Sequence, residues 1–274
     1  MSRNFALLQI VGKGQEYFQT ASETPELLAV PVHPLVPKTF PPDSAPPRLP
    51  EQQERDRQPL RFEMEGWQRE ELTKLVRGVF LAPGAESNHS VVLASSESGN
   101  GCSWICARAA ELLSTQVAGR VCLVDANFGR ATLHEHLGVP NHHGLSDALR
   151  QEGSMGGYVS QLSRRNLALL SAGTDFSADR PDRSADRNPD RNVAASERMR
   201  RRLRELRADF DYVLIDGVSL DVGDESIALG KMTDGIVLVL KTHSTRKERT
   251  RSRVWDLKSA GVRILGAVLN QPAC

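Results

Sequence analysis

Six continuous runs of apolar residues, separated by longer amphipathic stretches, constrain the fold of this chain more than any other feature. The runs are Ser90–Ser95, Val121–Val124, Leu167–Leu170, Tyr212–Ile215, Gly235–Leu240 and Arg263–Leu269. Strands that are apolar at nearly every position are buried on both faces, which is typical of a parallel sheet with helices on either side. The sequence therefore predicts an α/β fold with a mostly parallel central sheet covered by helices on both faces.

Amphipathic segments between these runs supply the expected helices. Trp67–Leu81 and Ser196–Phe210 each repeat apolar residues at the spacing of one helix face. Further helices are expected over Ser103–Val117, Thr132–Leu137, Leu145–Arg150 and Thr245–Ala260. The many arginines between Arg198 and Arg207 favour a solvated helix face, and a patch for a membrane surface or for nucleic acid is the alternative.

The composition divides the chain into an arm and a domain. Prolines recur from Pro31 to Pro59 too often for a helix or a central strand. We therefore expect residues 1–61 to be a disordered arm, with one short helix within Met1–Thr20. Residues 62–274 are expected to form the P-loop type domain, interrupted at 177–192 by a solvated loop in which Asp-Arg occurs four times.

Charge and cysteine content exclude several classes of function. The formal net charge is +1, so no overall field attracts nucleic acid, and no nucleic-acid partner is expected. No apolar run approaches the length of about 20 residues that spans a bilayer, which predicts a cytoplasmic chain. Cys102, Cys106, Cys122 and Cys274 do not have the spacing of a zinc site.

The turn after the first apolar run carries the chemistry. It reads Ser96-Glu97-Ser98-Gly99-Asn100-Gly101-Cys102-Ser103. Compared with the phosphate-binding pattern G-x-x-x-x-G-K-[ST], it keeps Gly101 and Ser103 but has Cys102 in place of the lysine. Bare glycine backbone can surround a phosphate with N–H groups at the start of a helix, and the serine hydroxyl is a ligand for Mg²⁺. The turn thus predicts a phosphate loop that has lost its cation.

Two aspartates support this interpretation. Asp125 and Asp216 each end an apolar run. In parallel sheets ligands bind at the carboxyl ends of the strands, and Mg²⁺ prefers oxygen ligands. We therefore expect Ser103, Asp125 and Asp216 to surround a magnesium ion.

Four blocks of residues resemble bacterial tyrosine kinases of capsular and exopolysaccharide biosynthesis, within the ParA/MinD clan of P-loop proteins. The blocks are Glu71–Arg77, Ser95–Ser103, the stretch from Val121 through Arg130 to Asp147, and Phe210–Asp216. The resemblance covers about Trp67–Gln271 and implies ATP or ADP with Mg²⁺ as the cofactor. It assigns catalytic roles to Asp125 and Asp216. Nucleotide contacts are expected from Ser98, Gly99, Asn100, Gly101, Cys102, Ser103, Trp104, Arg130 and Asn270. Oligomer contacts are expected from Glu71, Lys74 and Arg77.

The chain also departs from the pattern of that family. It has Cys102 for the lysine, Trp104 for a small hydroxyl residue, Asn127 for a second aspartate, and Gly217-Val218-Ser219 where proline is usual. The family's tyrosine-rich tail is not found, since the tyrosines are Tyr17, Tyr158 and Tyr212. Lys74, Lys231 and Lys241 belong to other elements and are not expected to replace the lysine. Cys102 is interpreted as a simple replacement, and a low-pKa redox thiol at a helix N-terminus is the alternative.

These departures favour a pseudokinase. Losing one charge-assisted contact costs about 1.5–3 kcal/mol in binding, whereas losing one preorganised donor to a transition state costs a rate factor of about a hundred to a thousand. Turnover should therefore suffer far more than affinity. The resemblance implies a homo-oligomer and, as a partner, the cytoplasmic part of a membrane polysaccharide co-polymerase or a kinase paralogue, which would recruit the chain to the inner face of the membrane. An active kinase or ATPase in which an arginine such as Arg130 replaces the lysine, and a ParA/MinD-like positioning protein, are the alternatives.

Overall fold

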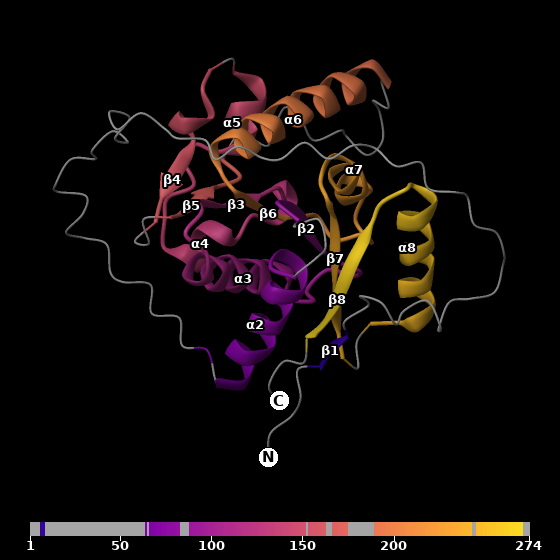
Figure 1. Cartoon of the computed structure of the whole chain (residues 1–274). Helices are drawn as coiled ribbons and strands as arrows, with labels where there is room; N and C mark the ends of the chain where they lie inside the picture. The colour runs from indigo at the N-terminus through magenta and orange to yellow at the C-terminus, as the bar shows by residue number, and fades with distance from the viewer. Residues whose placement is uncertain are drawn as a thin grey trace, which may run out of the picture.

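The computed structural model describes residues 6–8, 64, 66–82, 88–151, 153–162, 166–174, 189–242 and 245–270. These residues form an eight-stranded sheet in the order β1-β8-β7-β2-β6-β3-β5-β4 (Figure 1). The strands are β1 Ala6–Leu8, β2 Ser90–Ser95, β3 Val121–Asp125, β4 Val159–Gln161, β5 Leu167–Leu170, β6 Tyr212–Asp216, β7 Gly235–Lys241 and β8 Ile264–Asn270. The inner pairs are parallel, and only the edge strands β1 and β4 run antiparallel to their neighbours. The predicted α/β fold with a mostly parallel sheet is confirmed.

Helices cover both faces of the sheet. They are α2 Gly66–Phe80, α3 Cys102–Gln116, α4 Leu133–Leu137, α5 Leu145–Arg150, α6 Pro189–Asp209, α7 Glu225–Met232 and α8 Lys247–Ser259, with 3-10 turns at Phe128–Arg130 and Met155–Gly157. Successive strand residues point to opposite faces. Val91 and Leu93 accordingly pack in one core cluster with α2, α3 and α4, whereas Val92 and Ala94 pack in a second cluster with α5 to α8.

The helices and strands differ from the sequence prediction in four places. Strand β4 and helix α7 were not predicted, because each is short and has no clear apolar period. Helix α6 begins at Pro189, inside the segment predicted as a loop over 177–192, because proline at the first helical position loses no hydrogen bond. The rest of that loop lies outside the described residues.

The helix predicted within Met1–Thr20 is wrong for the part that is described. Residues Ala6–Leu8 form strand β1, which pairs antiparallel with β8 so that Ala6 lies opposite Leu269. The outer edge of β8 has free backbone N–H and C=O groups, and an added strand satisfies them. The other residues of the predicted arm lie outside the described part of the chain.

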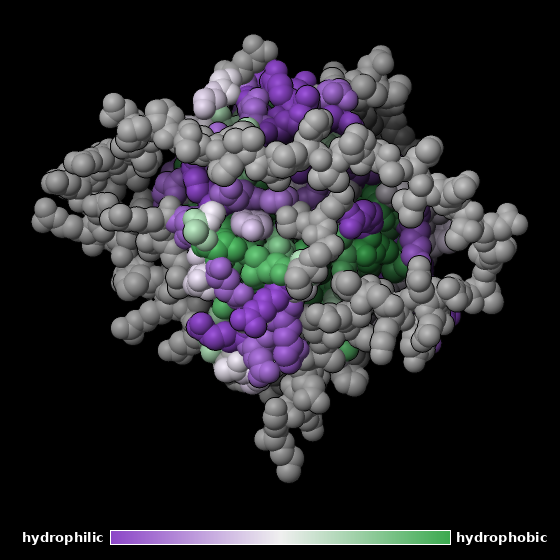
Figure 2. Space-filling model, viewed as in Figure 1, coloured by the Kyte–Doolittle hydropathy of each residue, from purple (hydrophilic) through white to green (hydrophobic). Residues whose placement is uncertain are grey.

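The arginine-rich helix α6 is only partly a solvated face. Arg198, Arg200, Arg201 and Arg204 are exposed, and hydrophilic side chains cover the region of α6 at the top of the molecule (Figure 2). Arg202, in contrast, is only 2% exposed and is the largest fully buried side chain among the described residues. The prediction of a solvated face therefore fails for Arg202.

The strand register places the polar strand ends along one edge of the sheet. Asn270 of β8 lies opposite Lys241 of β7, and Asp125 of β3 lies opposite Asp216 of β6. Strand β2 lies between β7 and β6, and the Ser96–Gly101 loop follows it. Neighbouring strands are about 4.8 Å apart. The loop is therefore flanked by Lys241 and Asn270 on one side and by the two aspartates on the other.

No helix in the described part of the chain combines the length and the apolar character needed to cross a membrane.

Candidate functional site

The Ser96–Gly101 loop has the backbone shape that its glycines predict. Gly99 has φ 82° and Gly101 has φ 83°, a left-handed region that side-chain-bearing residues rarely adopt. Gly101 caps α3 without a side-chain hydrogen bond, so the first N–H groups of this helix are not capped by a side chain. A Cβ added at Gly101 would collide with the side-chain amide of Asn270. The loop can therefore bring bare backbone N–H groups to an anion at the start of α3.

Asn100 and Asn270 tie this loop to the neighbouring strands. The buried Asn100 amide donates to the Val239 carbonyl at 3.3 Å and to the Thr245 hydroxyl at 3.5 Å. The Asn270 amide donates to the Asn100 carbonyl at 2.8 Å. Of the predicted nucleotide contacts, Asn100 thus supports the loop from inside, and Asn270 lies against Gly101.

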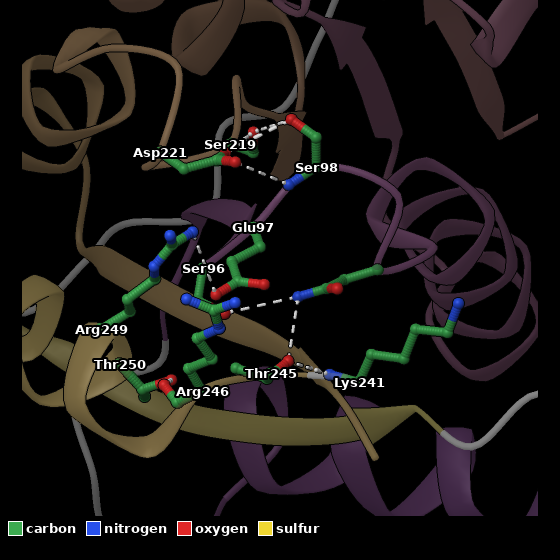
Figure 3. Close-up of polar contacts among 11 residues, drawn as sticks. Ser96, Glu97, Ser98, Ser219, Asp221, Lys241, Thr245, Arg246, Arg249 and Thr250 are labelled. Atoms are coloured by element: carbon green, nitrogen blue, oxygen red, sulfur yellow. Dashed lines mark hydrogen bonds and ion pairs between the residues drawn. The ribbon is translucent and has the colours of Figure 1, made fainter. Parts of the chain in front are cut away.

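A second set of contacts holds the outer turn of the loop. The Ser98 hydroxyl lies 2.7 Å from the Ser219 hydroxyl, and the Ser98 backbone N–H donates to Asp221 at 3.3 Å (Figure 3). Partial burial acts to raise the pKa of Asp221, but the hydrogen bonds from Ser219 and Ser98 outweigh it and lower that pKa. Sequence reasoning missed Ser219 and Asp221, because nothing in the local pattern marks two polar residues after β6 as neighbours of the loop.

The two predicted aspartates are fully buried side by side. Asp125 and Asp216 are both 0% exposed and lie opposite each other in the β3–β6 ladder. Asp125 accepts backbone hydrogen bonds from Leu133 at 3.1 Å and from Asn127 at 3.2 Å. Burial raises the pKa of Asp125 to about 6, against the opposing effect of these bonds.

Asp216 is the less satisfied of the two aspartates. Neither of its carboxylate oxygens has a hydrogen-bond partner of normal geometry. Burial, followed by the charge of Asp125, raises the pKa of Asp216 to about 7, although the nearby Ser103 hydroxyl and Cys102 thiol act to lower that pKa. A buried carboxylate without partners is costly. The site therefore offers two unused oxygen atoms beside a phosphate-type loop.

This arrangement fits a magnesium ion. Mg²⁺ takes oxygen ligands, keeps several waters and is usually held by one or two carboxylates together with the phosphates of a nucleotide. Asp216 has both oxygens available and Ser103 lies close to it, whereas both oxygens of Asp125 already accept backbone hydrogen bonds. Asp216 and Ser103 are therefore the better candidate ligands, and Asp125 contributes charge behind them.

Cys102 does not have the properties of a redox thiol. Its side chain is buried and belongs to the core cluster on the α2–α4 face of the sheet. Burial, with the negative charge of Asp216 as the second cause, raises the pKa of this thiol well above its ordinary value. The alternative of a lowered pKa at the helix N-terminus is therefore wrong, because desolvation outweighs the helix dipole.

The buried thiol leads to a prediction for chemical labelling. Only the thiolate reacts, so we expect Cys102 to resist iodoacetamide in the native protein at pH 7.5 and to react only after unfolding in denaturant. Site-resolved mass spectrometry would measure this, with the buried Cys122, whose pKa is raised to about 12, as an internal control. Rapid native labelling at Cys102 but not at Cys122 would contradict the prediction.

The remaining predicted residues lie in different surroundings. The Trp104 ring packs against the core cluster, 5.5 Å from the Arg108 guanidinium, and Arg130 is exposed at the end of the 3-10 turn after β3. On α2, the exposed Lys74 donates to Glu71 at 2.8 Å, and Arg77 is exposed one turn further along. Lys74 and Arg77 therefore lie on an accessible surface of the helix, with the partly buried Glu71 beside Lys74.

Comparisons with known proteins place these features in context. No family model matches the chain. The tyrosine-protein kinase YwqD of Bacillus subtilis is 27% identical over 181 residues, which are 66% of this chain and 71% of that protein. The putative tyrosine-protein kinase CapB of Staphylococcus aureus is 24% identical over 66% of this chain and 75% of its own length. The succinoglycan biosynthesis transport protein ExoP of Rhizobium meliloti is 27% identical, but the match covers only 23% of that protein.

Solved structures with this fold include kinase domains and ATPases. The kinase domain of the Escherichia coli tyrosine kinase ETK superposes with a TM-score of 0.64 at 18% identity, covering 81% of this chain and 87% of that one. The chimerical protein CapA2B2 gives 0.61 at 22% identity, covering 73% and 83%. The septum site-determining protein MinD of Pyrococcus horikoshii, complexed with Mg-ADP, gives 0.52 at 20% identity, covering 65% and 68%. At these identities the structures support the fold.

Proposed function

We propose that this chain, whose homologues are bacterial tyrosine-protein kinases on a ParA/MinD-like P-loop fold, is a nucleotide-binding pseudokinase that regulates exopolysaccharide assembly. One observation carries the proposal. The buried Asp216 has two unpartnered carboxylate oxygens beside a phosphate-type loop, and the residue at the lysine position of that loop is the buried Cys102. The oxygens suit a magnesium–nucleotide complex, and a thiol cannot stabilise phosphoryl transfer.

Different residues of the site would bind different parts of a magnesium–nucleotide complex. The backbone N–H groups of Gly99–Ser103 would bind the phosphates, and Asp216 with Ser103 would hold Mg²⁺, which neutralises phosphate charge when bound. Asn270, whose amide lies against Gly101, would border the base. The cation that a P-loop lysine normally aims at the outer phosphates has no counterpart at Cys102, so transfer should be slow even where binding persists.

The proposal extends to partners and location. Lys74 and Arg77 are exposed on α2, and Glu71 lies beside Lys74. We propose that this surface contacts a second copy of the chain or an intact kinase paralogue. The co-polymerase type of partner is suggested by a relative named as a succinoglycan biosynthesis transport protein. In this proposal the chain is cytoplasmic and is brought to the membrane by that partner.

Calorimetric titration with ADP–Mg²⁺ and ATP–Mg²⁺ tests the proposal. We expect the wild-type chain to bind both and to release phosphate from ATP no faster than the Asp216→Asn variant. We expect Asp216→Asn to weaken binding of the magnesium complex by about ten- to a hundredfold, the equivalent of one lost charge-assisted contact.

The variant Cys102→Lys sharpens this test. Restoring the cation is expected to raise phosphate release above the wild-type level, because binding groups are already in place. Wild-type phosphate release well above that of Asp216→Asn would instead identify an active ATPase or kinase. Undetectable binding by the wild-type chain would end the nucleotide proposal and leave partner binding as the function.

A further inference from the structure

We infer that Lys241 supplies the positive charge that the phosphate loop has lost at Cys102, by contacting the phosphates nearest the ribose of a bound nucleoside di- or triphosphate. The inference rests on the proposed nucleotide binding and names the residue that would sustain it. Lys241 ends β7, the strand next to β2, and no sequence pattern places it near the loop. Lys241 does belong to another element, as expected, but that element is the direct neighbour of β2, so the expectation that Lys241 would not replace the lost lysine is revised.

The order of the strands puts Lys241 between the two ends of the nucleotide site. At the carboxyl edge of the sheet, Asn270 of β8 is the direct neighbour of Lys241 of β7, and the loop after β2 comes next. With the base at Asn270 and the outer phosphates over the start of α3, the ribose and the inner phosphates would cross the end of β7. Lys241 is the last residue of β7 and therefore lies at that position.

Strand alternation puts the Lys241 side chain on the same face as Cys102. Val237 and Val239 belong to the core cluster that contains Cys102 and Ile105 of α3, whereas Leu238 belongs to the cluster on the opposite face. Residues two apart in a strand share a face. Lys241 therefore projects from the α3 face of the sheet, beyond Val239, at the edge where α3 begins.

Hydrogen bonds connect Lys241 to the loop itself. The Lys241 backbone N–H donates to the Thr245 hydroxyl at 2.9 Å, and the same hydroxyl accepts from the buried Asn100 of the loop at 3.5 Å. These two hydrogen bonds, which share the Thr245 hydroxyl, therefore fix the position of the Lys241 backbone relative to the loop. Its side chain is half-buried and extended in Figure 3, where no contact is drawn to its ammonium group. Within the described residues, no hydrogen bond or ion pair holds that ammonium group.

Other nearby cations are less well placed. Arg249 lies 3.9 Å from Glu97, so its charge is directed to a carboxylate (Figure 3). Arg130 follows β3, on the far side of Asp216 from β7, and is exposed. Lysine is a compact charge on a flexible four-carbon chain, which can reach an anion a few ångströms from its backbone. Lys241 is thus better placed than Arg249 or Arg130 to replace the lost lysine as a binding group.

The position of Lys241 also explains why nucleotide binding would persist while phosphoryl transfer is lost. A cation beneath the inner phosphates attracts ADP and ATP alike, because both carry those phosphates. It does not follow the outermost phosphate during transfer, which is where a P-loop lysine acts. The expected outcome is a site that retains nucleotide without restored catalysis.

Calorimetry on Lys241→Gln tests the inference, with Lys231→Gln as the matched control. Lys231 is exposed on α7, whose last turn leads to the start of β7 at the opposite edge of the sheet, so both variants lose one charge but only one loses it at the loop. We expect Lys241→Gln to weaken ADP–Mg²⁺ binding by about ten- to a hundredfold. Adenosine should bind both variants equally, and Lys241→Arg should recover most of the ADP affinity.

The outcomes separate this inference from the proposed function. If the wild-type chain binds ADP–Mg²⁺ and Lys241→Gln matches Lys231→Gln, the role of Lys241 is overturned while nucleotide binding stands. If the wild-type chain binds no nucleotide, both are overturned. Thermal unfolding curves of the two variants should coincide, and a selective loss of folding in Lys241→Gln would show a structural role instead.

Discussion

Replacing Arg202 by methionine is expected to lower the free energy of unfolding by about 3–5 kcal/mol, the cost of breaking a buried hydrogen-bonded charge network. The guanidinium donates to the carbonyls of Ala148 and Gly153, each at 2.7 Å, and also to the carbonyl of Gln151. A further bond joins it to Glu205 at 2.6 Å. Methionine fills similar space but donates nothing, so three carbonyl groups at the end of α5 would lose their partner.

Urea denaturation followed by circular dichroism measures this change. Arg200→Met on the same helix is the matched control, because Arg200 is half exposed and its contact within the described residues is a surface ion pair with Glu197 at 3.7 Å. The control should shift stability by no more than about 0.5 kcal/mol. Equal effects of the two substitutions would show that the Arg202 network contributes no more than a surface arginine.

Replacing Asp216 by asparagine is expected to stabilise the nucleotide-free protein at pH 8 by up to about 4 kcal/mol, since each unit of pKa shift corresponds to about 1.4 kcal/mol. Its pKa rises from 3.8 to about 7 on folding, with burial as the main cause and Asp125 as the second. Between these values the folded state binds a proton that the unfolded state has released. The wild-type stability should therefore fall as the pH rises from about 4 to about 7. The stability of the Asp216→Asn variant should not fall over this pH range, because asparagine does not ionise.

The pH dependence of the melting temperature tests this prediction. The difference in melting temperature between Asp216→Asn and the wild type should be small near pH 4, grow through pH 5 to 7 and be complete at pH 8. Asp221→Asn provides a control of opposite sign, because the pKa of Asp221 is lowered and its ionised form is the one that accepts hydrogen bonds from Ser98 and Ser219. A melting temperature for Asp216→Asn that lies below the wild type at pH 8 would contradict the account of Asp216 as a costly unpaired carboxylate.

The two predictions describe opposite uses of buried charge. Arg202 is buried with its donors satisfied, so it stabilises the junction between α5 and α6. Asp216 is buried without a hydrogen-bond partner of normal geometry, so it destabilises the folded chain, and the proposed magnesium ion would offset that cost. Such a local conflict between stability and polarity is expected at a functional site. The proposed loss of affinity in Asp216→Asn can be interpreted cleanly, because that variant is expected to be the more stable protein.

Most of the fold could be predicted because it depends on local patterns. Strands β2 and β5 have the predicted bounds, β3, β6 and β7 are one residue longer at the C-terminal end, and β8 is shifted by one residue. The positions of Asp125 and Asp216 followed from these runs, since the ends of parallel strands meet at one edge. Strand β1 could not be predicted, because three residues carry no period and pair only once β8 presents a free edge.

The amino-acid sequence by itself determined the parallel sheet, the glycine-containing loop and the loss of the lysine at Cys102, because each depends on the type and spacing of neighbouring residues. The tertiary structure alone decided what surrounds those residues. It brought Val239 to within hydrogen-bond distance of Asn100, 139 positions away in the chain, and with it Lys241 to the edge of the loop. It also buried Cys102 beside Asp216, which raises the pKa of the thiol instead of lowering it. Burial and long-range neighbours set the energies of charged groups, and neither is contained in a local pattern.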